Sequence, residues 1–157
     1  MTNKLLLDTS FFIRLLNDED ALHNNALAYF KYFLEQNFEL KCSTISIAEY
    51  CVRGKLMDLP LNNLQIIPFN VQHAIKAGEF ARIVFTHKNS LKVESRNIIP
   101  NDTKLFAQAD FENINSFVTS DKEADKIVEI IKRETNLKFN LINIYTPFHE
   151  YFGILNL

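Results

Sequence analysis

The chain opens on a short run of apolar residues that ends abruptly on an acid. Residues 4–7 carry the pattern of a buried strand, Asp8 follows them directly, and the stretch 11–16 predicts a helix. Such a strand delivers Asp8 to its carboxyl end, which is the edge where open α/β sheets build their binding sites. The first sixteen residues therefore predict a strand, a helix and one candidate functional side chain between them.

Apolar residues recur at helical spacing in much of the remaining chain. Between residues 21 and 36 they follow the i, i+3, i+4, i+7 pattern of an amphipathic helix, at Ala26, Tyr29, Phe30 and Phe33. Similar patterns predict helices over 46–53, 71–85, 102–111 and 124–131, and strands over 40–44, 116–119 and 141–144. Strands separated by helices need crossover connections, so the chain predicts a parallel sheet in an α/β fold.

Two segments lack a clear period. Residues 65–69 fit either a short edge strand or an irregular connection, and both alternatives stay open. Residues 88–99 predict a loop or a ragged extension of the preceding helix. Neither segment changes the predicted fold class.

Composition favours one domain. The chain has 157 residues, of which 47% are hydrophobic, and no stretch rich in Pro, Gly or Ser divides it. A chain of this length buries a substantial core as a single unit, so we expect one domain over residues 1–157. With 3 Gly and 4 Pro against 14 Phe, the sequence is poor in turn-forming residues and predicts helices joined by short connections.

The sequence also bears on the cellular compartment. The first sixteen residues are interrupted by Asp8 and Arg14, and no apolar run approaches the roughly 20 residues of a membrane helix. We therefore expect neither a signal peptide nor a membrane span. Cys42 and Cys51 have no C-x-x-C spacing and no nearby histidine, which argues against structural zinc and a disulfide framework. A cytoplasmic protein with reduced thiols is the expectation.

Three further acids stand at or near predicted helix starts, namely Glu49, Asp102 and Asp121. The carboxyl ends of parallel strands lie at one edge of a sheet, so these acids and Asp8 could converge there. Carboxylate oxygens are the preferred ligands of hard divalent cations such as Mg²⁺. Together the four acids predict a cation site.

Each acid also has a purely structural explanation. Glu49 and Glu123 each stand three residues after a serine, which matches the capping box at a helix start. Asp102 follows a Pro-Asn pair, and Asp121 would lie in a first helical turn, where the helix dipole favours negative charge. Taken singly, each acid fits helix capping better than metal binding. Only the recurrence of all four favours a site.

Four segments, in this order, resemble the signature segments of PIN domains, and in particular of the VapC-type toxins of prokaryotic toxin–antitoxin pairs. They are Leu-Leu-Leu-Asp-Thr-Ser at the start, Ser-Ile-Ala-Glu-Tyr around Glu49, Asn-Asp followed by Lys-Leu-Phe-Ala-Gln-Ala, and Val-Thr-Ser-Asp-Lys around Asp121. The resemblance extends from residue 4 to about residue 144. It implies a single-domain α/β/α sandwich with a mostly parallel central sheet.

The resemblance also implies an activity. In that family the acids bind Mg²⁺ or Mn²⁺ and the proteins cleave RNA, which suggests a metal-dependent endoribonuclease. By resemblance the metal-binding and catalytic residues are Asp8, Glu49, Asp102 and Asp121. Asp125 lies one helical turn after Asp121 and is a further acid that could support the metal from outside its direct ligands.

Partners follow from the same resemblance. A VapC-type toxin implies an RNA substrate and a small antitoxin protein, and a homodimer is a further expected assembly. A silencing partner would cover the cleft or place a cation among the acids. The apolar patches to consider are those around Phe11, Phe12 and Leu15 and along 29–33, although the same side chains could form the core.

The distribution of charge is more informative than its sum. A formal net charge of −2 does not point to nucleic acid. Between residues 76 and 104, however, basic residues outnumber acidic ones, which suits contacts to backbone phosphates beside an acidic centre. The candidate RNA-binding residues are Arg82, Lys88, Lys92, Arg96 and Lys104. A solvated surface loop is the alternative explanation for each of them.

Two other functions remain open from the residues. An aspartyl phosphotransfer or phosphatase domain also places acids at strand ends, but the dehalogenase pattern needs an acid two residues after the first Asp, where this chain has Ser10. A non-catalytic PIN-like interaction protein would use its acids only to cap helices. Metal binding would separate that protein from a nuclease.

Overall fold

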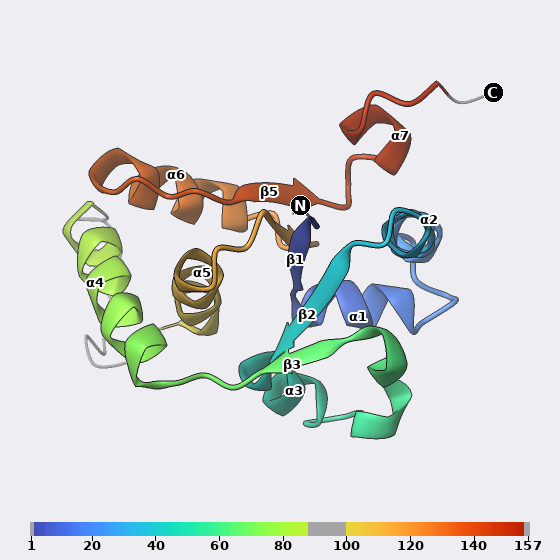
Figure 1. The fold of residues 1–157 in the computed structure, drawn as a ribbon, viewed down its shortest axis with the longest axis horizontal. Coiled ribbons are helices and arrows are strands. Elements are labelled where there is room, and N and C mark those ends of the chain that lie inside the picture. Colours follow the sequence, from blue (N-terminus) through green and yellow to red (C-terminus); the bar gives the residue numbers. More distant parts are fainter. Residues whose placement is uncertain (1, 88–99, 156–157) are drawn as a thin grey trace.

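The computed structural model describes residues 2–87 and 100–155 and has a five-stranded sheet between two layers of helices (Figure 1). The sheet has the order β3-β2-β1-β4-β5, and all four pairings are parallel. The strands are β1 (Lys4–Leu7), β2 (Glu39–Ser43), β3 (Gln65–Ile67), β4 (Ser116–Thr119) and β5 (Asn140–Asn143). The predicted α/β fold with a parallel sheet is confirmed.

Seven helices accompany the sheet in the part of the chain that is described. They are α1 (Thr9–Leu15), α2 (His23–Glu35), α3 (Thr44–Tyr50), α4 (Val71–His87), α5 (Asn101–Phe111), α6 (Ala124–Glu134) and α7 (Phe148–Tyr151). Helices α4, α5 and α6 lie on one face of the sheet, and α1, α2 and α7 lie on the other (Figure 1). None of the helices described is long and apolar enough to cross a membrane.

The order of the strands creates a switch point beside β1. The chain first builds outward from β1 through β2 to the edge strand β3, and then returns to place β4 on the opposite side of β1. In open parallel sheets, ligands bind where the strand order reverses, at the carboxyl ends of the strands. The residues that follow β1 and β4 therefore lie at the position where this fold is expected to carry a site.

Side chains alternate between the two faces of β1, so each helical layer covers its own core. Leu6 packs with the α4, α5 and α6 layer, whereas Leu5 and Leu7 pack with α1 and α2. Rings fill both cores. Phe106 packs against both Phe117 and Phe139, at centroid distances of 5.0 and 5.9 Å.

The predicted elements match the structure closely, with differences at the ends. The helix expected over 21–36 is α2, the strand expected over 116–119 is β4, and residues 65–67 do form an edge strand. Two short 3₁₀ turns, Leu56–Asp58 and Leu61–Asn63, and the helix α7 were not predicted. The segment 88–99, with Lys88, Lys92 and Arg96, lies outside the described residues.

The apolar residues considered as a partner surface form the core instead. Phe11, Phe12, Tyr29 and Phe33 are at most 1% exposed, and Leu15 is buried with them. The exposed apolar side chains nearby are Ile13 on α1 and Leu16, which follows the helix directly. The helix turns its other apolar side chains toward the sheet.

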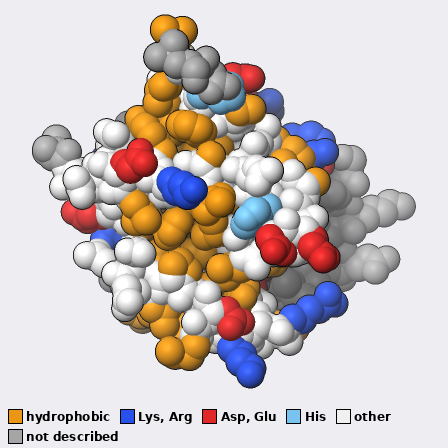
Figure 2. All heavy atoms as spheres, turned by 90° about the vertical axis from the view of Figure 1, so that its right-hand side faces the viewer, with side chains coloured by type: hydrophobic (Ala, Val, Ile, Leu, Met, Phe, Trp, Pro, Cys, Tyr) orange, Lys and Arg blue, Asp and Glu red, His pale blue; other side chains and the backbone are white. Residues whose placement is uncertain are grey.

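Helix α7 covers the aromatic side of α2. The ring centroids of Tyr32 and Phe152 are 4.5 Å apart, and Phe148 packs against Tyr29 at 6.2 Å. Figure 2 shows this face of the molecule, where a band of hydrophobic side chains is interrupted by isolated charged groups. Close to the sequence end, Tyr151 and Ile154 are still about two-fifths exposed, at 38% and 39%.

Truncating a core ring tests this packing. Phe106→Ala should lower the free energy of unfolding by about 3 to 5 kcal/mol, because it leaves a cavity between Phe117 and Phe139. Urea titration followed by circular dichroism measures the change. Phe111→Ala, on the same helix but 41% exposed, should cost clearly less. Equal losses in the two variants would contradict the assigned core.

Candidate active site

Asp8 lies at the carboxyl end of β1 and is held by three donors. Its Oδ1 accepts from the backbone N–H of Thr9 at 2.8 Å, and its Oδ2 accepts from the hydroxyl groups of Ser10 and Thr119, each at 2.9 Å. The side chain is buried, at 5% exposure. Burial raises the pKa of Asp8, the charge of Glu49 adds to that rise, and the hydroxyl bonds oppose it. Asp8 therefore caps α1 and faces the other acids at once.

The end of β4 is tied to the same place. Thr119 Oγ1 accepts from the backbone N–H of Asp121 at 3.0 Å while donating to Asp8, and Ser10 Oγ accepts from the backbone N–H of Ser120 at 2.9 Å. Asp121 Oδ1 in turn accepts from the N–H of Glu123. These bonds fix the loop after β4 against the loop after β1.

Glu49 reaches the site from the last turn of α3, so the expectation that it stands near a helix start is wrong. The helix begins at Thr44 and is capped by Ser43, whose hydroxyl accepts from the N–H of Ile45 at 3.1 Å. A capping box for Glu49 is therefore excluded. Glu49 Oε1 instead accepts from Thr9 Oγ1 at 3.2 Å, next to Asp8.

Asp102 enters from the first turn of α5 and meets the carboxyl group of Asp121. Burial, a hydrogen bond between these two carboxyl groups, and the negative charges of Asp8, Asp121 and Glu49 raise the pKa of Asp102 to about 7. Asp8, Glu49 and Asp121 are therefore close enough to Asp102 to raise its pKa. A carboxyl group with this pKa still holds a proton in a large fraction of molecules at neutral pH.

The donor set suits a hard cation, although it does not form a closed cage. Asp8, Glu49, Asp102 and Asp121 offer only carboxylate oxygens, as Mg²⁺ and Mn²⁺ prefer. Within residues 2–87 and 100–155, no group of three or more acidic, His or Cys side chains is close enough to hold a metal ion as it stands. Asp102 and Asp121 share a hydrogen bond, whereas Asp8 and Glu49 bond to neighbouring hydroxyl groups. A cation would offset the repulsion that raises the pKa of Asp102.

The remaining predicted site residues lie around the acids or apart from them. Asp125 is exposed in the first turn of α6 and is not among the charges that raise the pKa of Asp102. Lys104 is half-buried two residues after Asp102, with its Nζ 3.5 Å from Asn101 Oδ1. Arg82 is exposed on α4. Asp121 is therefore the acid after β4 that contacts Asp102.

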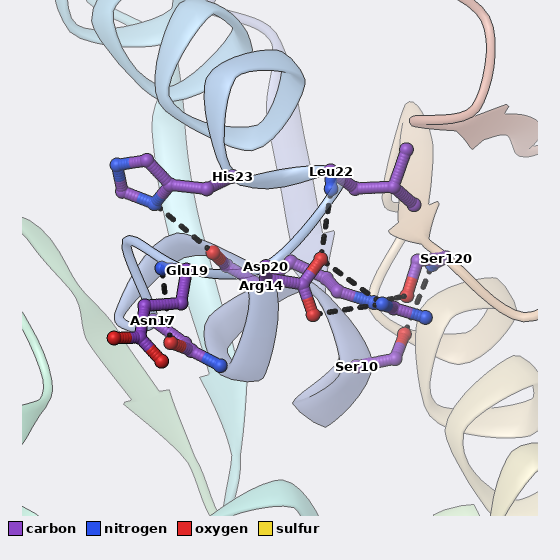
Figure 3. A network of polar contacts seen from close by, with 8 residues as sticks. All are labelled: Ser10, Arg14, Asn17, Glu19, Asp20, Leu22, His23 and Ser120. Atoms are coloured by element: carbon purple, nitrogen blue, oxygen red, sulfur yellow. Dashed lines mark hydrogen bonds and ion pairs between the residues drawn. The ribbon is translucent and has the colours of Figure 1, made fainter.

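An arginine that reaches the residue before Asp121 was not identified from the sequence (Figure 3). Arg14 Nη1 lies 3.0 and 2.8 Å from the carboxylate oxygens of Asp20, and its Nε lies 3.5 Å from Ser120 Oγ. The backbone N–H of Leu22 and the Arg14 guanidinium keep the pKa of Asp20 below its usual value. Arg14 thus places a positive charge next to the loop that carries Asp121. A contact between residues 106 positions apart leaves no local signal in a sequence.

The hydroxyl groups that orient the acids were missed as well, although they lie within the recognised segments. Thr9 and Ser10 directly follow Asp8, and Thr119 precedes Asp121 by two positions. Each hydroxyl group bonds at least one of the candidate acids. Small hydroxyl residues next to an acid at a strand end are the signal that could have identified them.

A mostly apolar groove of about 580 Å³ borders the site between α1 and α3. It is lined by Ile13, Leu16, Asn17, Glu49, Tyr50, Val52, Arg53 and Gly54. Glu49 belongs both to the groove and to the cluster of acids. The groove therefore joins an exposed apolar surface to the charged centre.

Comparisons with known proteins support the fold described above. The sequence model of the PIN domain matches residues 5–130. No curated protein matches the chain in sequence. Among solved structures, VapBC2 from Rickettsia felis bound to a fragment of its promoter DNA is 25% identical with a TM-score of 0.57, covering 88% of this chain and 98% of that chain.

Two more distant structures share the fold. DNA-bound VapBC from Salmonella typhimurium is 16% identical with a TM-score of 0.59, and the match covers 91% of this chain and 99% of that chain. VapC20 from Mycobacterium tuberculosis, described as a Sarcin-Ricin loop cleaving toxin, is 17% identical with a TM-score of 0.54, and the match covers 78% of this chain and 93% of that chain. At these identities the likeness concerns the fold alone.

The raised pKa of Asp102 predicts a stability change with a definite sign. The folded protein binds this proton more tightly than the unfolded chain, so the group destabilises the fold increasingly as pH rises from about 4 to its pKa of about 7. In EDTA at about pH 8, Asp102→Asn should therefore melt higher than the wild type. The difference should shrink as the pH is lowered toward 5.

Asp20→Asn is the matched control, because the pKa of Asp20 is lowered rather than raised. This variant loses the ion pair with Arg14 and should melt lower than the wild type at the same pH. Thermal melts followed by circular dichroism give both signs in one series. A lower melting temperature for Asp102→Asn at pH 8 would mean that the acids do not repel one another.

Proposed function

This chain belongs to the PIN domain family, and on that premise we propose that it is a metal-dependent endoribonuclease, the toxin of a toxin–antitoxin pair. The observation that carries the proposal is the meeting of Asp8, Glu49, Asp102 and Asp121, from four separate segments, at the switch point of the sheet. The likeness to VapBC complexes and to a toxin described as cleaving the Sarcin-Ricin loop supports it. We further propose that the protein acts in the cytoplasm.

In the proposed mechanism these four acids hold Mg²⁺ or Mn²⁺. When bound, the cation lowers the pKa of the attacking water and offsets the charge of the scissile phosphate. Thr119 and Ser10 fix the carboxylate of Asp8, and Thr9 orients that of Glu49. Asp102 and Asp121 share a proton, which must dissociate before both carboxylates can act as ligands. Cation affinity should therefore increase as the pH is raised from below 7 to above it.

The alternative functions fit the geometry less well. An aspartyl phosphotransferase needs an accessible nucleophilic carboxylate, whereas both oxygens of Asp8 accept hydrogen bonds and the side chain is 5% exposed. A non-catalytic protein whose acids only cap helices would favour their charged forms and lower their pKa values. The pKa of Asp102 is raised instead.

The groove between α1 and α3 is our candidate contact for the small antitoxin protein. Its apolar side chains, including Ile13, Leu16 and Val52, are 50%, 41% and 79% exposed. Glu49 lies at the junction with the acids, so a partner segment with apolar side chains and a cation would complement the groove and the site together. A homodimer remains an expectation in addition to this complex.

Replacing a metal ligand should abolish cleavage. Asp8→Asn or Asp102→Asn removes one negative charge at nearly constant volume, so RNA hydrolysis in Mg²⁺ or Mn²⁺ should fall by at least about 100-fold while the far-ultraviolet circular dichroism stays native. Cleavage of labelled RNA, resolved on denaturing gels, measures the loss. Asp125→Asn should keep most of the activity, because Asp125 is exposed and apart from the other acids.

Chelation gives an independent arm of this test. Excess EDTA should stop cleavage by the wild type, and added Mn²⁺ should restore it. Cleavage that continues in EDTA, or that survives Asp8→Asn undiminished, would exclude the proposed mechanism.

Charge in the groove should prevent binding of the partner. Leu16→Asp and Val52→Asp place a carboxylate on an apolar docking surface, so co-expression with the product of a short adjacent gene should no longer yield a complex on gel filtration. Met57→Asp is the control, because Met57 is 81% exposed and does not line the groove. A complex that survives both groove variants would place the partner elsewhere.

A further inference from the structure

An ammonium group lies over an aromatic ring at the edge of the site, on the side of β5. Lys122 directly follows Asp121, and its Nζ lies 4.6 Å from the ring centroid of Tyr145. Tyr145 stands two residues beyond the end of β5 and is 40% exposed. Neither residue belongs to the proposed metal site, and we call this pair the β5 rim.

Hydrogen bonds fix the β5 rim relative to the acids. Asn143 Nδ2 donates to the backbone oxygen of Asp121 at 3.0 Å, and Asn143 Oδ1 accepts from the backbone N–H of Tyr145 at 3.2 Å. The N–H of Ile144 donates to the carbonyl oxygen of Thr119 at 3.0 Å. One side chain, Asn143, therefore bridges the loop of Asp121 and the turn of Tyr145.

The charges around the site show what this rim could contribute. Four acids repel a phosphodiester, so RNA needs cationic contacts close by. Arg14 is paired with Asp20, and Lys126 with Glu123. Lys122 is exposed, and among the ion pairs of the described chain it has no carboxylate partner. The ammonium group of Lys122 is therefore not neutralised by any carboxylate that the structure describes and can bind a phosphate.

We propose that the β5 rim is a nucleotide-binding subsite for single-stranded RNA; this inference rests on the proposed function. Tyr145 stacks on the base of a nucleotide next to the scissile phosphate, and Lys122 binds a phosphate of the same strand. Every base has a π-face, so stacking on a tyrosine does not depend on the RNA sequence. The lysine beside the ring can bind the negatively charged RNA backbone. The two residues position the substrate, and the acids carry out the chemistry.

Binding can be measured apart from cleavage. In an Asp8→Asn background, for which the proposed function predicts no cleavage, fluorescence anisotropy of a fluorescein-labelled mixed-sequence RNA of about twelve nucleotides gives the dissociation constant. Tyr145→Ala should weaken binding roughly fivefold or more, and Tyr145→Phe should leave it unchanged, because the ring is retained. Tyr151→Ala, which removes a ring of similar exposure on α7, should have no effect.

Salt dependence tests the cation separately. Lys122→Gln should reduce the slope of log K against log salt by about 0.7, the contribution of one phosphate contact on a single strand, and Lys122→Arg should preserve it. A purely structural Lys–Tyr contact would change the melting temperature and leave this slope alone. If Tyr145→Ala does not fold, Tyr145→Phe and the two Lys122 variants still decide the question.

The outcomes separate the two proposals. Binding that depends on Tyr145 in a chain whose wild type cleaves no RNA would support the rim and overturn the nuclease. Wild-type affinity in Tyr145→Ala, or an unchanged salt slope in Lys122→Gln, would overturn the rim whatever the activity. A Tyr145→Ala variant that loses only a protein partner would make the rim a protein contact and also overturn the inference.

Discussion

The Thr119 hydroxyl joins the two central strand ends, and the arrangement of the site depends on it. It donates to the carboxylate of Asp8 after β1 and accepts from the backbone N–H of Asp121 after β4. Parallel pairing of β1 with β4 brings these two ends side by side, and the hydroxyl sets their relative position. Glu49 and Asp102 then approach from α3 and α5. Ser10 Oγ, which accepts from the backbone N–H of Ser120, adds a second bond between the same two loops.

Holding acids together is unfavourable, and the rest of the fold has to offset it. The pKa of Asp102 is raised to about 7 by burial and by neighbouring negative charges, which means that the fold is destabilised by ionising this group. Two cores, one on each face of the sheet, provide the compensating burial. This pattern is typical of a functional site, where an unfavourable local arrangement persists because the surrounding packing enforces it.

The sheet also separates the surfaces around the acids. The apolar groove lies toward α1 and α3, where Glu49 belongs to both groove and site. The β5 rim lies beyond β4, on the other side of the switch point. An inhibitory protein in the groove and a single-stranded RNA on the rim would therefore reach the same acids from different sides. Competition would arise at the acids themselves, because a cation from the partner would occupy the place of the metal ion that offsets the charge of the phosphate.

The sequence by itself determined most of the elements and gave the four acids as candidates. Apolar periodicity located α2 and β4, and a leucine run ending on Asp8 identified the central strand, because burial on both faces leaves a local pattern. Only the tertiary structure decided that Glu49 points from a helix end rather than a helix start, that Phe11 and Tyr29 are core, and that Arg14 and Tyr145 border the site. The contacts of Arg14 and Tyr145 join residues distant in the chain, and spacing along a sequence carries no information about them. The position of Glu49 depends on where α3 begins, which is set by the cap at Ser43.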